Sequence, residues 1–389
     1  MRIVLLIGCL TLFSCVSKKS IKSVGSDDNP LKFHVEAAPE WTDLFYRKSG
    51  WFGADGIFSI PLDGIDKNSG QEETLLIFSD TYIGEVQDNK PLPGHSMVNN
   101  TIAYFHGTDP KKENIQFHYN KDSTGKPTSF FKPIISSTGH DQYFWLGDGF
   151  INKELDNQLF IFAYHVEKTG PNVFDFIDPA VSLLALPEGS RPPYLFQRQI
   201  ETPLHLSLPF GEGNLGSGIL VNTKWAGVPD ADGFIYVYGC IGSDKNLVVA
   251  RVKPKHFEDF SRWRYWTSEG WSKNQSLIIP ITDAASNELS VTPLPDGRYL
   301  LVFQVLGLSD KVGIRIGDSP IGPFSEIQEI WHTPEYEEGL LPYNAKAHPA
   351  LSKPGELLIS YNTITFDFWN DIQQNAHIYR PRFIKMIFD

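Results

Sequence analysis

The sequence is poor in cysteine, which limits the covalent links that could hold a fold together. Only Cys9, Cys15 and Cys240 occur in 389 residues. Cys9 lies in a segment of signal-peptide form, and Cys15 stands at its expected cleavage point. Cleavage would leave Cys240 as the one cysteine free to pair, so no intrachain disulfide is expected. Cys240 stands in the strand-like run "FIYVYGCIG" and is predicted to be an inert buried thiol.

Several chemistry-bearing patterns are also missing. The net charge is −12, and no basic run follows the first twenty-odd residues, so nucleic acid is not an expected partner. There is no Cys/His pattern at zinc spacing, no HExxH and no phosphate-binding glycine loop. "GNLGSGIL", Gly213–Leu220, superficially suggests a nucleophile elbow around Ser217. Its flanks read as strands rather than as a strand-to-helix turn, which argues against that chemistry.

The N-terminus predicts an envelope protein. "MRIVLLIGCLTLFSC" has one Arg and an apolar run from Ile3 to Phe13, which is too short to span a membrane. Leu12–Cys15 resembles a bacterial lipobox, with Cys15 as the lipidated residue; an ordinary secretory signal is the alternative. We expect residues 1–15 to be a signal peptide and 16–40 a flexible tether. The protein would then be lipid-anchored at the bacterial cell envelope, periplasmic or at the cell surface.

Short apolar runs bounded by Gly, Pro, Asn and Asp fill the chain from residue 41, without a long amphipathic helix. This pattern is typical of all-β proteins. Strand-like centres recur at a spacing that suits four-stranded blades, at Leu75, Leu159, Phe234, Tyr299 and Leu357. We therefore predict one five-bladed β-propeller over residues 41–389, closed by pairing of "RFIKMIF" with an early strand. Two β-sandwiches joined near Glu188–Phe196 are the alternative.

Four acids stand at strand ends, each flanked by Gly or other small residues. They are Asp80 after "TLLIFS", Asp148 in "YFWLGDGFIN", Asp55 in "GWFGADGIF" and Glu288 in "ASNELSV". Each alone could simply cap a turn. Together in a central funnel they would suit glycosidic hydrolysis, which needs one protonated and one ionised carboxyl group. A third acid nearby can tune that pair.

A family resemblance supports this interpretation. The ordered motifs "FSDT", "MVNNTIAYF", "YFWLGDGFI", "YVYG", "VVARV", "FSRWRYWTSEGW", "SPIGPFS", "YNAKAHPALS" and "LLISYN" span nearly all of Trp51–Phe383. They resemble a bacterial family of five-bladed propellers that is similar to arabinanase-like glycosidases and has endo-D-arabinanase relatives. The resemblance implies a glycoside hydrolase acting on an arabinan-like or related glycan. Asp80 and Asp148 lie on its most recognisable motifs.

Five further residues are candidates for substrate binding. They are Asn99, Asn100, Trp145, His348 and Arg382. Trp145 could stack on a sugar, although an aromatic residue could equally belong to the core. Arabinanase-like propellers often place a His over a central calcium, so the resemblance makes a calcium at His348 an option, while no cofactor is required. The alternatives are turns for the Asn pair, packing for His348 and a structural salt bridge for Arg382.

Two other functions remain open at this stage. A lipid-anchored surface protein could bind a glycan without cleaving it, because a fold does not specify a function. A lyase would need a base beside a cation, for which His348 with Arg382 is the nearest match. Carbohydrate and the membrane are the expected partners, and a monomer is the expected state.

Overall fold

The computed structural model describes residues 22–24, 30–67, 73–134 and 141–389, and its regular structure consists mainly of β-strands, with short 3-10 and α-helical turns between them. The two α-helices in these ranges are short, α1 (Pro39–Thr42) and α2 (Phe368–Gln374). No helix in this described part is long and apolar enough to cross a membrane. The all-β prediction is confirmed.

Five sheets of antiparallel strands follow one another along the chain. The first holds β4 (Phe58–Pro61), β5 (Glu73–Phe78), β9 (Thr101–His106) and β10 (Ile115–His118). The second holds β13 (Tyr143–Asn152), β14 (Gln158–Lys168), β15 (Phe176–Leu186) and β16 (Arg198–Glu201). The third holds β17 (His205–Leu208), β18 (Gly211–Asn222), β19 (Phe234–Ile241), β20 (Asn246–Val252), β21 (Arg264–Thr267) and β22 (Gly270–Ser272). The fourth holds β23 (Leu289–Pro293), β24 (Tyr299–Gln304), β25 (Lys311–Gly317) and β26 (Gln328–His332).

The fifth of these sheets joins the two ends of the described chain. It holds β27 (Leu341–Ala347), β28 (Glu356–Ile364), β29 (Arg382–Phe388), β2 (Leu31–Ala37) and β1 (Lys22–Val24). Two further sheets lie outside this series. One holds β3 (Ser49–Ala54), β6 (Thr81–Gln87), β7 (Lys90–Pro91) and β8 (Ser96–Val98), and the other pairs β11 (Asn120–Lys121) with β12 (Pro127–Thr128).

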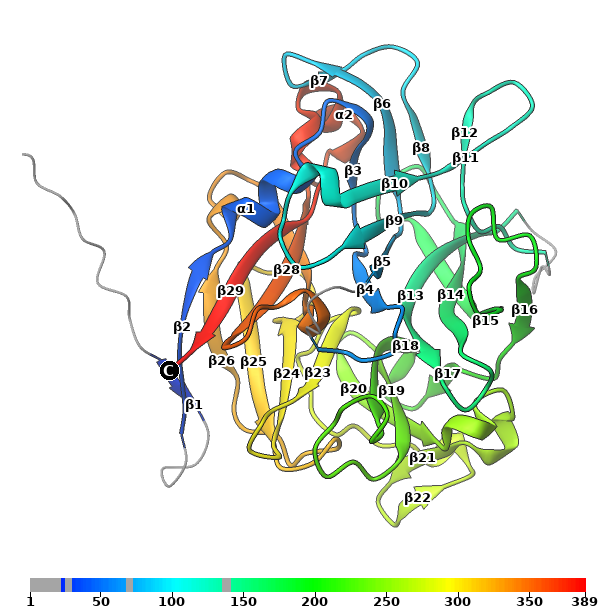
Figure 1. Cartoon of the computed structure of the whole chain (residues 1–389), viewed down its shortest axis with the longest axis vertical. Coiled ribbons are helices and arrows are strands. Elements are labelled where there is room, and N and C mark those ends of the chain that lie inside the picture. The colour runs from blue at the N-terminus through cyan, green and yellow to red at the C-terminus, as the bar shows by residue number, and fades with distance from the viewer. Residues whose placement is uncertain (1–21, 25–29, 68–72, 135–140) are drawn as a thin grey trace, which may run out of the picture.

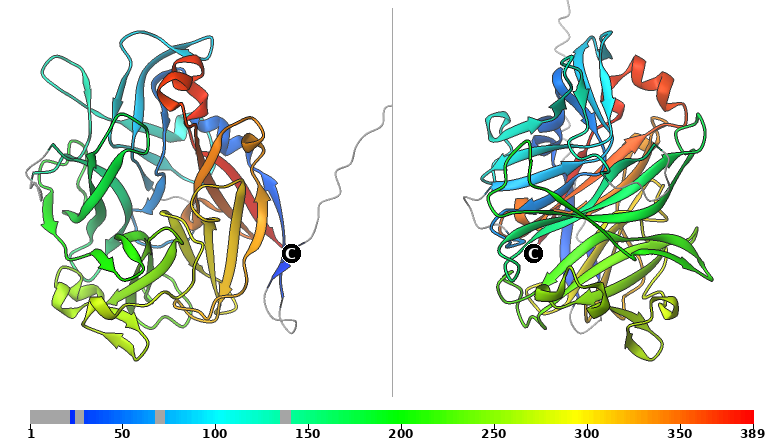
Figure 2. Two further views of the ribbon diagram at one scale, coloured as in Figure 1. Left: turned by 180° about the vertical axis from the view of Figure 1, so that it is seen from behind. Right: turned by 90° about the vertical axis from the view of Figure 1, so that its right-hand side faces the viewer.

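One inner strand from each of these sheets lies beside a common centre. β13 contacts β4 and β18, β23 contacts β18 and β27, and the 3-10 turn Pro349–Leu351 that follows β27 contacts β4. The sheets therefore follow one another around the centre in chain order, as Figures 1 and 2 show. This arrangement is propeller-like, while the number of blades stays a prediction.

Pairing of the last strand with an early one is confirmed. β29 lies between β28 and β2, with Phe33 opposite Phe388 and Ala37 opposite Ile384, and Figure 1 shows the red β29 beside the blue β2. The flexible tether predicted over residues 16–40 is therefore corrected for residues 31–37, which form this strand, whereas residues 16–21 and 25–29 lie outside the described residues. Alternation of Leu31, Phe33 and Val35 gives β2 one apolar face, and Phe33 is fully buried. The predicted signal peptide, residues 1–15, lies outside the described residues.

The core lies in apolar layers between neighbouring sheets. Ile77 and Phe78, adjacent on β5, point to opposite faces and belong to different layers. Because both faces are covered, the central strands read as continuous apolar runs, and polar side chains gather at the strand ends. Cys240 is buried and free, and its thiol donates to the Ser286 carbonyl at 2.9 Å. Glu188–Phe196 connects β15 to β16 within one sheet, so it is not a link between two sandwiches.

Candidate active site

Asp55 and Asp80 are held side by side where two strands of the first sheet continue into the sheet of β3 and β6. The Asp55 N–H donates to the Asp80 carbonyl at 3.3 Å, and the Ser79 N–H donates to the Asp55 carbonyl at 3.0 Å. Gly56 is required beside them, since its φ is +64° and a Cβ there would lie 2.8 Å from Ser79 Oγ. This double backbone link explains why small residues flank both acids.

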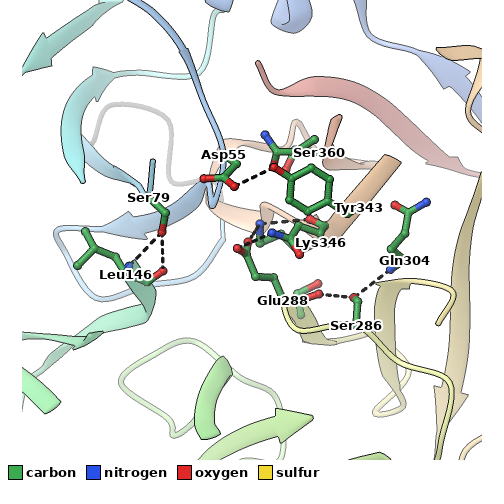
Figure 3. A network of polar contacts seen from close by, with 12 residues as sticks. Asp55, Ser79, Leu146, Ser286, Glu288, Gln304, Tyr343, Lys346 and Ser360 are labelled. Atoms are coloured by element: carbon green, nitrogen blue, oxygen red, sulfur yellow. Dashed lines mark hydrogen bonds and ion pairs between the residues drawn. The ribbon is translucent and has the colours of Figure 1, made fainter. Parts of the chain in front are cut away.

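Glu288 approaches the same region from the start of β23. Its Oε2 forms an ion pair with Lys346 Nζ, and its Oε1 accepts a hydrogen bond from Asn344 Nδ2 at 2.7 Å. The Lys346 side chain is only 2% exposed, and its ammonium group lies 4.5 Å from the centre of the Phe58 ring. The Ser286 hydroxyl donates to the Glu288 carbonyl and fixes its backbone. Figure 3 shows Glu288 between Lys346 and Ser286, with Asp55 nearby.

The three acids line one cavity of about 450 Å³. Its wall also contains polar and aromatic side chains from several sheets, including Tyr143, Trp145, Tyr164, Asp178, Asn214, Ser217, Tyr343 and Tyr379. One wall oxygen, Asp55 Oδ1, is buried and has no hydrogen-bond partner among the described residues. A cavity of this size with convergent polar groups is the usual form of a small-ligand site.

The surroundings raise the pKa of all three carboxyl groups above the ordinary values of about 3.9 and 4.3. Burial raises the pKa of Asp80, and the neighbouring charge of Asp55 raises it further. Burial also raises the pKa of Asp55, while the Tyr343 hydroxyl, which donates to Asp55 Oδ2 at 2.8 Å, opposes that shift. Burial raises the pKa of Glu288 to about 7 despite the opposing effect of Lys346. A protonated and an ionised carboxyl can therefore coexist here near neutral pH.

Asp148 is not brought together with these acids. A β-bulge between Leu146 and Gly149 sets its direction, and it lines a different cavity of about 810 Å³. Its two oxygens accept hydrogen bonds from the backbone N–H groups of Gly149 and Ile219, both at 2.8 Å. Burial raises its pKa to about 7. The prediction that Asp148 faces Asp80 is therefore corrected.

Comparison with known sequences places the chain in a family. The family model described as "Domain of unknown function (DUF5005)" matches residues 39–388. The chain belongs to the DUF5005 family. The matched range contains the predicted motifs, whereas the predicted relation to endo-D-arabinanases stays a prediction. No curated protein matches the sequence.

A solved structure shares the fold of this DUF5005 protein. A Bacteroides ovatus protein described as a "putative hydrolase" is 22% identical, with a TM-score of 0.69 over 91% of this chain and 90% of its own. That likeness establishes a shared fold. An α-L-arabinofuranosidase from Podospora anserina, solved with cellotriose, is 11% identical with a TM-score of 0.44 over 88% and 97% of the two chains. An exo-β-1,3-galactanase from Phanerochaete chrysosporium, solved with galactose, is 9% identical with a TM-score of 0.44 over 86% and 60%. These two likenesses are too distant to carry an argument.

Of the predicted substrate-binding residues of this DUF5005 protein, Trp145 lines the acid cavity and Asn99 bonds to one of its acids. Asn99 donates from Nδ2 to Asp80 Oδ1 at 3.1 Å and so orients that acid. Trp145 lines the cavity, and its indole N–H lowers the pKa of Asp80 electrostatically. Among the described residues, that N–H has no hydrogen-bond partner.

The other three predicted binding residues have structural roles. Asn100 is fully buried and bonds the backbone of Phe131 and Phe144. Both ring nitrogens of His348 are engaged by serine hydroxyls, Ser59 at 2.9 Å and Ser360 at 2.7 Å. Arg382 pairs with Glu335 at 2.9 Å and bonds two backbone carbonyls. All three corrections have one cause: strand-end polar residues also satisfy other buried polar groups, on the backbone or on side chains.

The predicted option of a central calcium at His348 does not fit the donors present. No group of three or more His, Cys, Asp or Glu side chains within the described ranges is placed to hold a metal ion. The serine contacts leave His348 without a nitrogen for an ion.

Lys346, Tyr164 and Asp178 line or support the acid cavity and were not predicted from the sequence. Asp178, on β15, accepts from Asn214 Nδ2 at 2.7 Å, and burial raises its pKa. Lys346 stands in "YNAKAHPALS", where a lysine between small apolar residues of a strand was a usable signal, because lysine is seldom buried without a partner.

Proposed function

We propose that this protein hydrolyses glycosidic bonds in the cavity lined by Asp55, Asp80 and Glu288. One observation carries the proposal: three half-buried carboxyl groups with raised pKa values, held by separate segments, surround one cavity. Glycosidic hydrolysis needs a neutral carboxyl to protonate the leaving oxygen and an ionised one as base or nucleophile. This set supplies both forms at neutral pH.

The surroundings favour a particular division of roles. Asp55 takes the ionised role, since the Tyr343 hydroxyl donates to it and stabilises its charge. Asp80 stays protonated beside the charged Asp55 and adjusts the pKa of Asp55. Glu288 takes the role of general acid, because its pKa of about 7 leaves a large protonated fraction at neutral pH.

The rival functions fit these contacts less well. A module that only binds glycans does not need several carboxyls with raised pKa values in one cavity. A lyase built on His348 and Arg382 lacks its parts, because His348 is bonded to two serines and Arg382 is paired with Glu335.

The test is hydrolysis of a panel of plant and microbial glycans, with released sugars as the readout. We expect Asp55→Asn and Glu288→Gln to fold and to lose turnover by at least roughly a hundredfold. Asp66→Asn is the matched control, because Asp66 lines the other cavity, and it should keep normal turnover. Normal turnover in both site variants, or no released sugar from any glycan with the wild type, would refute the proposal.

An arabinan-like substrate and a five-bladed architecture belong to the same proposal. The substrate rests on the motif resemblance, and linear arabinan is its direct probe. For the blades, we take the sheet of β3 and β6 as a continuation of the first blade, since only residues 55–57 separate β3 from β4 and only 79–80 separate β5 from β6. The remaining series of five sheets then supplies the five blades.

Anchoring at the cell envelope is also proposed. Its support is the lipobox-like Leu12–Cys15, which lies outside the described residues. A lipid on Cys15 would place the catalytic domain at the membrane surface, where it could act on glycans outside the cytoplasm.

A further inference from the structure

Exposed apolar side chains gather at the mouth of the acid cavity. Phe174, on the β14–β15 connection, is 42% exposed, and Trp369, on α2, is 37% exposed. Leu306 and Leu308, between β24 and β25, are 56% and 46% exposed and line the same cavity. Three separate segments thus present apolar surface at one place. Such a concentration beside a cavity marks a binding surface.

The aromatic part of this mouth is held in place without a ligand. Phe174 meets the ring of Phe366 edge-on at 6.1 Å, which links the β14–β15 connection to the segment before α2. Within that connection, Asp175 accepts from the Thr169 and Asn172 N–H groups at 2.9 and 2.8 Å. Trp369 packs against Phe368. A surface fixed in advance loses little entropy when it binds.

Charge identifies the kind of ligand that would bind here. The cavity wall contains six carboxyl groups and two ammonium groups: Asp55, Asp80, Asp175, Asp178, Glu212 and Glu288 against Lys168 and Lys245. The ammonium group of Lys346, which pairs with Glu288, adds a third positive charge, and protonation of one or two carboxyls still leaves an excess of negative charge. An anionic ligand would therefore be repelled. Carboxylates are, in contrast, good acceptors for hydroxyl groups.

We propose that the mouth formed by Phe174, Phe366 and Trp369 binds an uncharged glycan chain that extends out of the cavity. A sugar ring has an apolar C–H face that packs on an aromatic ring and polar edges that bond to acceptors. The rim supplies the rings and the inner wall supplies the acceptors. Sugars with carboxyl or sulfate groups are excluded by the wall. This proposal rests on the proposed function, because it assigns the substrate class of the same cavity.

The test measures binding rather than turnover, so that it can fail separately from hydrolysis. Affinity electrophoresis is run in gels containing arabinan, galactan or hydroxyethyl cellulose as neutral probes, and polygalacturonate as the anionic probe. We expect at least one neutral glycan to retard the wild type, and polygalacturonate to leave it unretarded. Phe174→Ala and Trp369→Ala should each weaken retardation about fivefold to tenfold.

Phe196→Ala is the matched control, because Phe196 is 79% exposed and does not line the cavity. It should bind like the wild type, and thermal unfolding of all variants should confirm that they fold. Normal binding by both rim variants, equal loss in the control, tighter binding of polygalacturonate, or no retardation by any neutral glycan would each overturn the inference. Binding without released sugar would overturn the proposed hydrolysis and leave the rim assignment standing.

Discussion

Lys346 offers a sharp test of the electrostatics at the candidate site. Its side chain is 2% exposed and pairs with Glu288, which is 13% exposed. Lys346→Met removes the ammonium group and keeps most of the side-chain volume. Breaking a buried ion pair by removing one partner costs about 3–5 kcal/mol, because the remaining charge is uncompensated.

The cost should depend on pH, and its sign follows from Glu288. Burial raises the folded-state pKa of Glu288 to about 7, so its neutral form stabilises the fold at low pH, and that contribution is lost as pH rises through 7. Without Lys346 this pKa rises further, because the ammonium group lowers it in the wild type. At pH 5 Glu288 is mostly neutral in both proteins, and the loss should be about 1 kcal/mol from the missing hydrogen bonds. At pH 8.5 the loss should reach about 3–5 kcal/mol.

Urea unfolding followed by tryptophan fluorescence at the two pH values measures this difference. At pH 8.5, the double variant Lys346→Met with Glu288→Gln should recover most of the unfolding free energy that Lys346→Met loses, because no buried charge remains. Lys311→Met is the control, since it breaks the Lys311–Glu329 pair, whose side chains are 38% and 39% exposed, and it should leave the unfolding free energy nearly unchanged because solvent screens exposed pairs. Equal losses at both pH values, or no recovery in the double variant, would refute the reasoning.

Three further predictions concern residues away from the acid cavity. Asp148→Asn should lower the unfolding free energy by about 1–3 kcal/mol, because the amide has one acceptor oxygen where the carboxyl group uses two for the Gly149 and Ile219 N–H groups. Turnover per folded molecule should stay within about twofold of the wild type. Thermal unfolding and specific activity measure the two effects. Arg382→Met should cost about 3–5 kcal/mol by leaving Glu335 unpaired, with unchanged glycan retardation of the folded fraction; weakened retardation would return Arg382 to the binding site. Cys15→Ser should move the protein from the membrane fraction to the soluble fraction, and unchanged fractionation would contradict the lipobox interpretation.

Buried strands and the acids at their ends could be predicted from the sequence, whereas the direction in which those acids point could not. Apolar runs such as Leu75–Phe78 carry enough signal to indicate a buried strand, and the acid after that run does line a cavity. Asp148 follows the same rule in the sequence, yet lines the other cavity. A single bulge reverses which side a strand residue faces, and nothing in "WLGDGF" distinguishes a bulged from a regular strand.

Buried polar partners were the other source of error. His348 and Asn100 have the chemistry of binding residues, but their partners come from distant parts of the chain, as with Ser59, 289 positions from His348. Such pairs depend on how the sheets pack, which local patterns do not contain. β2 was missed for a related reason: its short apolar alternation pairs with β29, at the other end of the described chain.

The pairing of β2 with β29 sets a limit on when this protein can finish folding. β2 is synthesised long before β29, so β2 has an unpaired edge until residues 382–388 leave the ribosome. Contacts between segments so far apart in sequence form slowly, because the intervening loop must close first. The domain therefore completes its fold only once β29 has been made, and a chain interrupted before β29 exposes a strand edge open to pairing with other chains.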